Sequence, residues 1–229
     1  MSKNKYIRRT KLSNYKIKQI IRHFVVDLTA IQTSKLLGIN RNSVNRIFNL
    51  IRDKIYEDLM LVDQDIKFSG EIELDESYFG AKRVRGKRGR GASGKTKVFG
   101  ILKRHGKVYV KIVENCSKKE LLPIIKGKIL SQETNVYTDG WKAYDSLITE
   151  GFNHYRIYHN ENEFARGKNH VNGVESFWGY AKHRLTKFKG FKKENFLKNL
   201  KECEWRFNNR NNSIDQQTKL ILNLTKDRK

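Results

Sequence analysis

The chain has 229 residues, and its 48 Lys and Arg side chains against 24 Asp and Glu give a formal net charge of +24. A hydrophobic fraction of 38% is enough for a packed core, which excludes a wholly disordered protein. Cys116 and Cys203 have no CxxC spacing, which excludes a disulfide framework and a zinc ribbon and indicates a reducing compartment. With no signal peptide and no membrane-spanning apolar run, we expect a cytoplasmic protein that does not enter membranes and whose charge attracts a polyanion, most simply nucleic acid.

Charge is organised in blocks along the chain. Residues 1–56 carry 13 basic and two acidic side chains, residues 57–80 carry eight acids and one base, and residues 81–111 carry 12 bases and no acid. The change of sign predicts a domain boundary near residue 60. The expected organisation is a helical domain in residues 1–60, a linker in 61–70, an α/β domain with C-terminal helices in 71–212 and a basic tail in 213–229.

The first domain is predicted to be all-α, with a helix-turn-helix. Apolar residues recur at spacings of three and four between residues 15 and 28, Thr29 suits a helix cap, and Gly38 and Asn40 suit a turn into a third helix. In such units the start of the last helix meets DNA base edges. The candidates for this contact are Arg41, Asn42, Ser43, Asn45 and Arg46. An ordinary three-helix packing unit is the alternative, but the charge excess favours DNA binding.

The centre of the chain changes to a strand pattern. Three β-branched and aromatic runs predict successive strands in GEIELDESYFG, KTKVFGILKR and KVYVKIVEN. A helix follows in SKKELLPIIKGKIL, and NVYTDG and HYRIYHN predict two further strands around a short helix in WKAYDSLI. Helices close the chain. The order βββαβαβαα predicts an α/β fold in which helices pack on a mixed sheet.

Two of the candidate metal ligands lie in predicted strands. Phosphodiester chemistry uses carboxylates that hold divalent metal, commonly two ions. Asp75 lies in an unusually acidic first strand, where we interpret Glu71 and Glu73 as a solvated edge. Asp139 ends the strand NVYTD, at the sheet edge where ligands gather in open sheets. A turn or capping role is the alternative for Asp139, since Asp before Gly is common in turns.

The third candidate lies on a predicted helix. Glu175 stands beside the apolar stripe of residues 174–185, and Lys182 falls on the same edge of the helix because seven residues make nearly two turns. Both side chains can therefore lean toward the sheet. A free surface glutamate and a solvated lysine are the alternatives.

Five motifs together give the chain a family resemblance. They are TSKLLGINRNSVNRIFNLIR, IELDESYFG, YTDGWKAY, NHVNGVESFWGYAKHRL and KECEWRFNNRN. With them the chain resembles the short bacterial transposases of the insertion sequence 1595 family, in a form without the zinc ribbon that some relatives carry. The resemblance implies an RNase H-like catalytic core and a triad of two Asp and a Glu or Asn, followed by a Lys. On this sequence these are Asp75, Asp139, Glu175 and Lys182, with Asn172 as the alternative third residue.

The resemblance also implies an activity and its partners. The chain would bind the terminal inverted repeats of an insertion sequence, cleave the strands there and join them to target DNA, using two ions of Mg²⁺ or Mn²⁺. Double-stranded DNA would be the partner, at the bacterial nucleoid, and the protein would act as a homodimer or higher oligomer. Further phosphate contacts are expected from a basic, glycine-rich loop and from one histidine, namely Arg85, Lys87, Arg88, Arg90, Lys95 and His170.

Two other functions compete with this interpretation. A helix-turn-helix protein without catalytic activity, either a repressor or an inactive descendant of a transposase, would explain the charge equally well, but it has no use for three carboxylates in so basic a chain. The segment GRGASGKT, residues 89–96, matches the phosphate loop of nucleotide hydrolases. The strand-like sequence that follows it argues against that function, because such a loop opens a helix.

Overall fold

The computed structural model describes residues 6–7, 10–63, 67–80, 95–130, 134–139, 144, 148, 151–157, 171–188 and 193–226. The chain divides into two compact units. The first contains Met1–Gln64 together with Lys198–Lys229, and the second contains Asp65–Leu197. Among the described residues, no helix is both long enough and apolar enough to cross a membrane.

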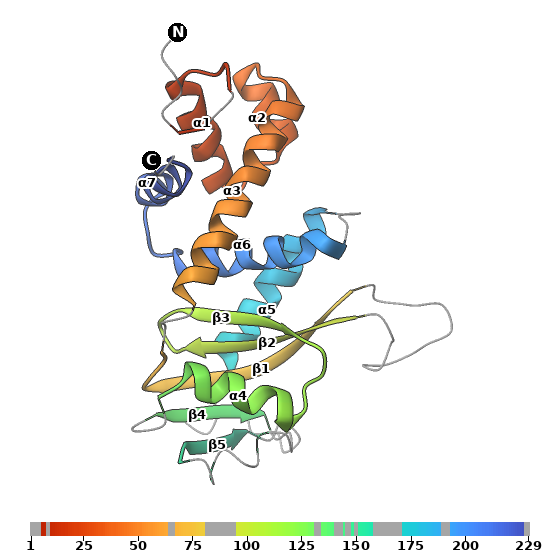
Figure 1. Ribbon diagram of the computed structural model, residues 1–229, viewed down its shortest axis with the longest axis vertical. Helices are drawn as coiled ribbons and strands as arrows, with labels where there is room; N and C mark the ends of the chain where they lie inside the picture. Colours follow the sequence, from red (N-terminus) through yellow and green to blue (C-terminus); the bar gives the residue numbers. More distant parts are fainter. Residues whose placement is uncertain are drawn as a thin grey trace, which may run out of the picture. The chain divides into compact units, whose positions relative to one another are not determined.

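The first unit is helical (Figure 1). It contains α1 (Asn14–Val25), α2 (Ala30–Leu37), α3 (Arg41–Val62), most of α6 (Phe196–Asn208) and α7 (Ile214–Thr225). Its core is formed by the apolar faces that the three-and-four spacing predicted. The buried members on α1 and α3 are Ile17, Ile20, Ile21, Phe24, Val25, Val44, Ile47, Phe48, Ile51 and Ile55.

Local capping fixes the turn between α2 and α3 as predicted. The Thr29 side chain accepts the N–H of Gln32, whose side chain returns to the N–H of Thr29, so α2 begins with a capping box. Gly38 ends the helix with φ 60°, in the left-handed region that glycine adopts without strain. Asn40 then caps α3 by accepting the N–H of Asn42. The predicted helices and caps are confirmed, whereas DNA recognition by them stays a prediction.

The C-terminal segment differs from the expected basic tail. Residues 214–225 form α7, which packs against α1 and α3 and buries Ile221 and Leu222 in the core of the first unit. Ser213 begins this helix with a capping box to Gln216. The helices after residue 198 therefore group with the N-terminal helices, whereas the sequence pattern assigned residues up to 212 to the α/β domain.

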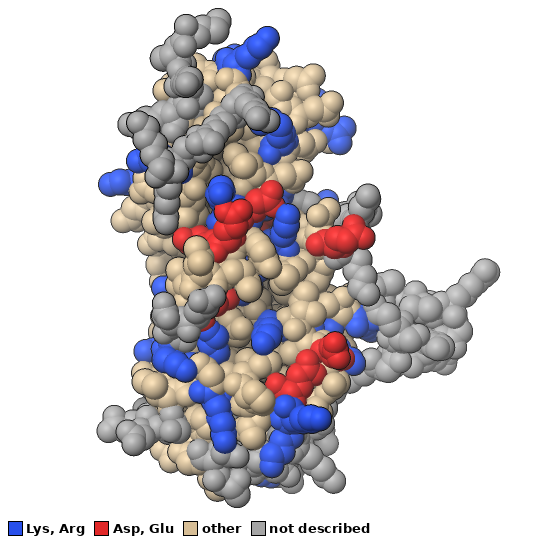
Figure 2. All heavy atoms as spheres, in the orientation of Figure 1, with Lys and Arg blue, Asp and Glu red and all other residues tan. Residues whose placement is uncertain are grey.

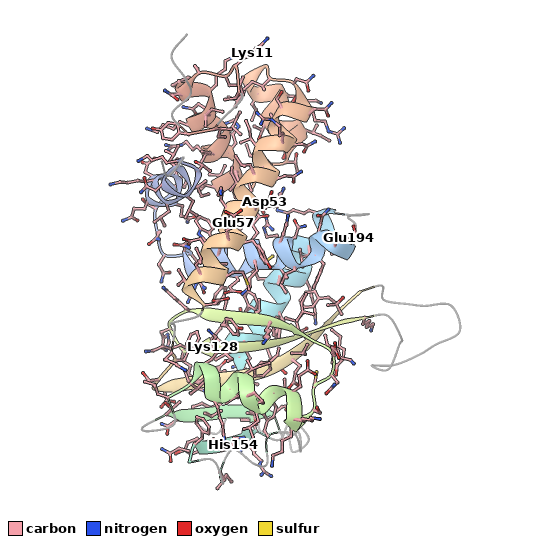
Figure 3. The ribbon with its side chains drawn as sticks, in the orientation of Figure 1. Lys11, Asp53, Glu57, Lys128, His154 and Glu194 are labelled. Atoms are coloured by element: carbon pink, nitrogen blue, oxygen red, sulfur yellow. The ribbon has the colours of Figure 1, made fainter. Side chains whose placement is uncertain are left out.

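A buried polar network fixes α6 within the first unit. Arg206 donates from Nη1 to the carbonyl of Val25 at 2.9 Å and from Nη2 to that of Phe24 at 2.6 Å, which satisfies the C-terminal end of α1. Its Nε donates to Glu202 at 2.9 Å. On the surface of the same unit, Lys198 pairs with Asp53 of α3 at 2.6 Å. Asp53 is labelled on this helix in Figure 3.

The second unit contains a five-stranded mixed sheet. Its strands are β1 (Glu71–Phe79), β2 (Thr96–Lys103), β3 (Val108–Val113), β4 (Asn135–Asp139) and β5 (Asn153–Ile157). The order across the sheet is β3-β2-β1-β4-β5; β1, β2 and β3 are antiparallel neighbours, and β4 is parallel to both β1 and β5. All five predicted strands are confirmed, and the short helix predicted at residues 141–148 lies largely outside the described residues.

Helices α4 (Lys118–Lys128) and α5 (Asn172–Leu185) lie on opposite faces of this sheet (Figure 1). Residues of β1 point alternately to the two faces. Ile72 and Leu74 join the apolar cluster under α4, whereas Glu73 and Asp75 make hydrogen bonds to α5. Two short 3-10 turns, Thr186–Phe188 and Lys193–Asn195, follow α5. Glu73 and Asp75 of β1 therefore face α5.

Candidate active site

Asp75 and Asp139 come together because β1 and β4 are parallel neighbours. Leu74 is paired with Thr138, so the next residue of each strand lies beside the other on the same sheet face. Burial raises the pKa of Asp75 to about 6, and repulsion from Asp139 and Glu175 adds to the rise. Hydrogen bonds from the backbone N–H of Glu76 and from Trp178 act in the opposite direction. The sheet thus holds two carboxylates together whose charges repel.

Glu175 reaches the same region from the first turn of α5. It is exposed, and its charge raises the pKa of Asp75, so the two carboxylates interact electrostatically. Asn172, also exposed, is the first residue of the helix. The exposed Lys182 places its Nζ 5.8 Å from the ring centroid of Phe79 at the end of β1. The structure therefore associates the three predicted acids and holds the predicted lysine on the helix that carries Glu175.

The acids have the chemistry of a site for a hard divalent cation. Mg²⁺ and Mn²⁺ take oxygen ligands, commonly carboxylates, and mutual repulsion of the kind felt by Asp75 is relieved by a bound cation. Within the described part of the chain, no three His, Cys, Asp or Glu side chains already stand in a metal-binding cluster. Asp75 and Asp139 are therefore suited to bind such an ion as a pair of ligands, with Glu175 as the nearby third carboxylate.

Glu73 is the functional residue that the sequence pattern missed. The expectation of a solvated strand edge is wrong for it, because Glu73 is 0% exposed. Its Oε2 accepts the backbone N–H of Val174 at 2.9 Å, and its Oε1 accepts Nε of Arg104 at 2.9 Å. Glu73 therefore binds the N-terminus of α5 where the helix dipole favours negative charge, and Arg104 compensates that charge. In the sequence, the one feature that could have indicated this role for Glu73 was the presence of four acids in a single strand.

The next contact along β1 involves Asp75 itself. The indole N–H of Trp178 donates to Oδ2 of Asp75 at 3.0 Å, and Trp178 is 4% exposed. Gly100 of β2 lies opposite Asp75 in the sheet. A Cβ atom at Gly100 would lie 2.5 Å from Cζ2 of Trp178, so the indole reaches the carboxylate across a position where only glycine fits.

On the other face of β1, Glu76 holds a further carboxyl group, which is half-buried. Burial raises its pKa to about 8, and the charges of Asp75 and Asp139 add to the rise, against a hydrogen bond from Tyr144. The hydroxyl group of Tyr144 donates to Oε1 of Glu76, and Tyr144 is buried. This hydrogen bond connects the chain five residues after Asp139 back to β1. The strand that carries Asp75 is thus tied to the segment after Asp139.

The predicted DNA-contacting residues are only partly described. At the start of α3, Arg41, Asn42 and Arg46 are exposed, whereas Ser43 and Asn45 are half-buried. Lys and Arg side chains occur over both units on the face in Figure 2. Among the loop residues and the histidine, those outside the described residues are Arg85, Lys87, Arg88, Arg90 and His170.

Lys95 is described and half-buried, and it directly precedes the strand β2. Lys95 and Thr96 therefore lead into a strand, and the helix that a nucleotide-binding loop requires does not follow them. This arrangement agrees with rejection of the nucleotide hydrolase function.

Comparison with known proteins adds independent information. Residues 67–208 match the family defined by the ISXO2-like transposase domain. An uncharacterized transposase-like protein of Haemophilus influenzae is 44% identical over 120 residues, which cover 52% of this chain and 94% of that protein. An uncharacterized protein in transposable element ISH50 of Halobacterium salinarum is 29% identical over 153 residues, 60% of this chain but only 52% of that protein. The solved structure of a pre-cleavage Mos1 transpososome is 10% identical, with a TM-score of 0.31, over 95% of this chain and 81% of that one.

Proposed function

Because the chain belongs to the ISXO2-like transposase family, we propose that it is a DNA transposase whose carboxylate pair, Asp75 and Asp139, is the core of its active site. The strand order β3-β2-β1-β4-β5, with three antiparallel strands followed by two parallel ones, supports assignment of the second unit as an RNase H-like catalytic core. The substrate is double-stranded DNA that carries the terminal inverted repeats of the element. The target DNA into which the ends are joined is the second substrate.

Asp75, Asp139 and Glu175 would hold the divalent cation, as one ion or two. When bound, Mg²⁺ or Mn²⁺ activates water and stabilises charge on the leaving oxygen of a phosphodiester. The chain's own groups prepare this site. The hydrogen bonds from Trp178 and from the N–H of Glu76 favour the ionised form of Asp75 and so oppose the effect of burial, and β4 holds Asp139 beside it. Lys182 supplies a positive charge near the phosphate on the α5 side.

Glu175 is the proposed third carboxylate, in preference to Asn172. The supporting observation is that the charge of Glu175 acts on Asp75. A neutral asparagine at the first position of the helix offers the cation a single amide oxygen and does not offset its charge.

DNA binding is assigned to two parts of the protein. The exposed Arg41, Asn42 and Arg46 at the start of α3 are suited to base edges and phosphates. The basic segment between β1 and β2, with Arg85, Lys87, Arg88 and Arg90, is suited to phosphate contact. Since two element ends must be brought together before joining, we propose that the protein acts as a homodimer or higher oligomer on DNA.

The observation that carries this proposal is the side-by-side placement of Asp75 and Asp139, with burial and mutual repulsion at Asp75. The test is cleavage of labelled duplexes that carry the terminal inverted repeats, with Mg²⁺ or Mn²⁺ present. Wild-type protein is expected to nick the ends, and Asp75→Asn and Asp139→Asn to abolish nicking while end binding persists.

Glu71→Gln is the matched control, because Glu71 is an acid of the same strand outside the carboxylate pair. Comparison of Glu175→Gln with Asn172→Ala assigns the third residue. Cleavage that survives Asp75→Asn would overturn the mechanism. Sequence-specific binding without cleavage by wild-type protein would instead support the non-catalytic DNA-binding alternative.

A further inference from the structure

We propose that Trp178 is a positioning residue for the metal site: its indole N–H fixes the carboxylate of Asp75 for cation binding, and Gly100 provides the room that the indole needs. This inference rests on the proposed function. It assigns to Trp178 and Gly100 a role that neither residue type suggests alone. An apolar tryptophan on a helix stripe ordinarily serves packing, and a glycine inside a strand ordinarily weakens it.

The first argument is the polarity of the indole. Trp178 is buried, and its ring packs edge-on against Phe79, with centroids 6.0 Å apart. A buried indole N–H requires an acceptor, since it has a single donor and cannot reach bulk water. That acceptor is Oδ2 of Asp75 at 3.0 Å. The largest apolar side chain of α5 therefore ends on the carboxylate that is proposed to bind the cation.

The second argument is the fit of the ring over β2. A Cβ atom at Gly100 would lie 2.5 Å from Cζ2 and 2.9 Å from Cη2 of Trp178, closer than such atoms approach in proteins. Because Gly100 is paired with Asp75 of β1 on one side and with Val110 of β3 on the other, its backbone is held in the sheet and the indole would have to move. Gly100 is paired with Asp75 across the strands, so displacement of the ring acts directly beside the carboxylate.

The third argument is that two contacts hold α5 along β1. Glu73 accepts the N–H of Val174, and Asp75 accepts the indole N–H of Trp178. Four helix residues rise about 6 Å and two strand residues span about 6.8 Å, so alternate acids of the strand meet successive turns of the helix. Glu175 lies in the helix between the two contacts. Trp178 therefore fixes both Asp75 and the turn that carries Glu175.

Such a hydrogen bond matters for a cation because a carboxylate oxygen accepts more than one partner. With Oδ2 held by the indole, the carboxylate keeps acceptor directions for a metal while its rotation is restricted. Loss of a partner that orients a metal ligand typically weakens metal affinity by about 10-fold to 100-fold. A residue that served only packing would change stability and leave affinity unchanged.

The experiment measures binding of Mg²⁺ and Mn²⁺ to the full chain by isothermal titration calorimetry, with folding checked by circular dichroism. Trp178→Phe removes the N–H and keeps an aromatic ring, and it is expected to weaken binding about 10-fold or more. Gly100→Ala is expected to weaken binding similarly by displacing the indole. The matched control is Trp205→Phe, at another buried tryptophan, in the core of the first unit, with no change in affinity expected.

The double variant separates positioning from general damage. Gly100→Ala in the Trp178→Phe background is expected to add less than about twofold, because the atoms that clash belong to the indole ring and are gone. Additive losses would overturn the assignment of Gly100. An NMR spectrum of ¹⁵N-labelled protein supplies a second readout: the indole N–H signal that is lost in Trp178→Phe is expected to shift when Mg²⁺ is added to wild type.

The outcomes distinguish the two proposals. A folded Trp178→Phe protein that binds Mg²⁺ as tightly as wild type overturns this inference and leaves the proposed function standing. An indole signal of Trp178 that is unchanged while calorimetry shows binding also overturns it. Wild-type protein that binds neither Mg²⁺ nor Mn²⁺ overturns the proposed function and this inference together.

Discussion

Glu73 of β1 accepts the backbone N–H of Val174 at 2.9 Å, so a strand near the start of the second unit holds the helix near its end. The same carboxylate pairs with Arg104, whose guanidinium lies 3.8 Å from the ring centroid of Tyr137. Glu73 is thus a buried charge: one of its oxygens binds the guanidinium of Arg104, and the other binds the N-terminus of α5. Its role is to set the position of α5 relative to the sheet.

Replacing Glu73 by Ala is therefore expected to destabilise the second unit by about 3 kcal/mol, because Arg104 loses its buried partner and the N–H of Val174 loses its acceptor. Chemical denaturation monitored by circular dichroism measures the change. The control is Glu71→Ala, because Glu71 also pairs with Arg104 but its side chain is 38% exposed. It is expected to cost less than about 1 kcal/mol. Equal losses for the two variants would show that burial of Glu73 has no special weight.

The raised pKa of Asp75 makes metal binding depend on pH. Since this pKa is about 6, Asp75 is ionised above pH 6 and available to a cation, whereas below pH 6 a proton occupies it. Calorimetric affinity for Mg²⁺ is expected to be constant at high pH and to fall by up to about tenfold per unit below pH 6. Affinity that stays constant down to about pH 4, the ordinary pKa of an aspartate, would contradict the shift.

The same shift affects the stability of the metal-free protein with a defined sign. The folded state holds the Asp75 proton more tightly than the unfolded chain, because its pKa is raised from 3.8 to about 6. This contribution favours folding below pH 4 and is lost as pH rises to about 6. Asp75→Asn has no such group, so its unfolding free energy is expected to decline less over this interval. Identical pH profiles for the two proteins would contradict the sign.

Arg206 is predicted to be a principal stabilising residue of the first unit. Its three hydrogen bonds, to the carbonyls of Phe24 and Val25 and to Glu202, use the fixed fork of a guanidinium. Arg206→Lys is expected to cost about 3 kcal/mol, since one ammonium cannot reproduce this geometry. The exposed pair of Arg22 with Asp215 is the control, and Arg22→Ala is expected to cost less than about 1 kcal/mol. Chemical denaturation that finds Arg206→Lys as mild as Arg22→Ala would contradict the assigned role.

The start of α3 is predicted to contact DNA. Arg41→Ala and Arg46→Ala should each weaken binding to the end duplex and reduce the slope of log affinity against log salt by about one, because each removes one phosphate-neutralising cation. Lys54→Ala is the control on the same helix, since Lys54 lies more than two turns beyond Arg46 and pairs with Glu57. Fluorescence anisotropy over a series of salt concentrations measures the slope. Slopes that match the control would remove α3 from the DNA interface.

Local patterns predicted most of the elements, because caps and periodicity are properties of neighbouring residues. Thr29, Gly38 and Asn40 form the turn expected of them, and each predicted strand is present. The capping box of Ser213 and Gln216 was equally local and marks α7, but the charge of the C-terminal segment suggested a tail instead. Composition misled there, whereas capping chemistry and the three-residue interval between Thr218 and Ile221 indicated a helix.

The site was predictable only in part, since it depends on register between distant segments. Asp75 and Asp139 could be proposed because both are acids in strands. The burial of Glu73 could not be foreseen, because it follows from the N-terminus of a helix about 100 residues later and from Arg104, which lies 31 residues later at the end of the neighbouring strand β2. The contact between Gly100 and Trp178 could not be foreseen either, since nothing in the sequence around one residue indicates the other.

The central claim is that Asp75 and Asp139 form the cation site of a DNA-cleaving enzyme. Its most direct test is the anomalous scattering of crystals of the protein soaked with Mn²⁺. A manganese peak bonded to carboxylate oxygens of both residues, absent from crystals of Asp139→Asn, is the predicted result. Manganese bound elsewhere on the protein, with both carboxylates out of contact with it, would contradict the claim.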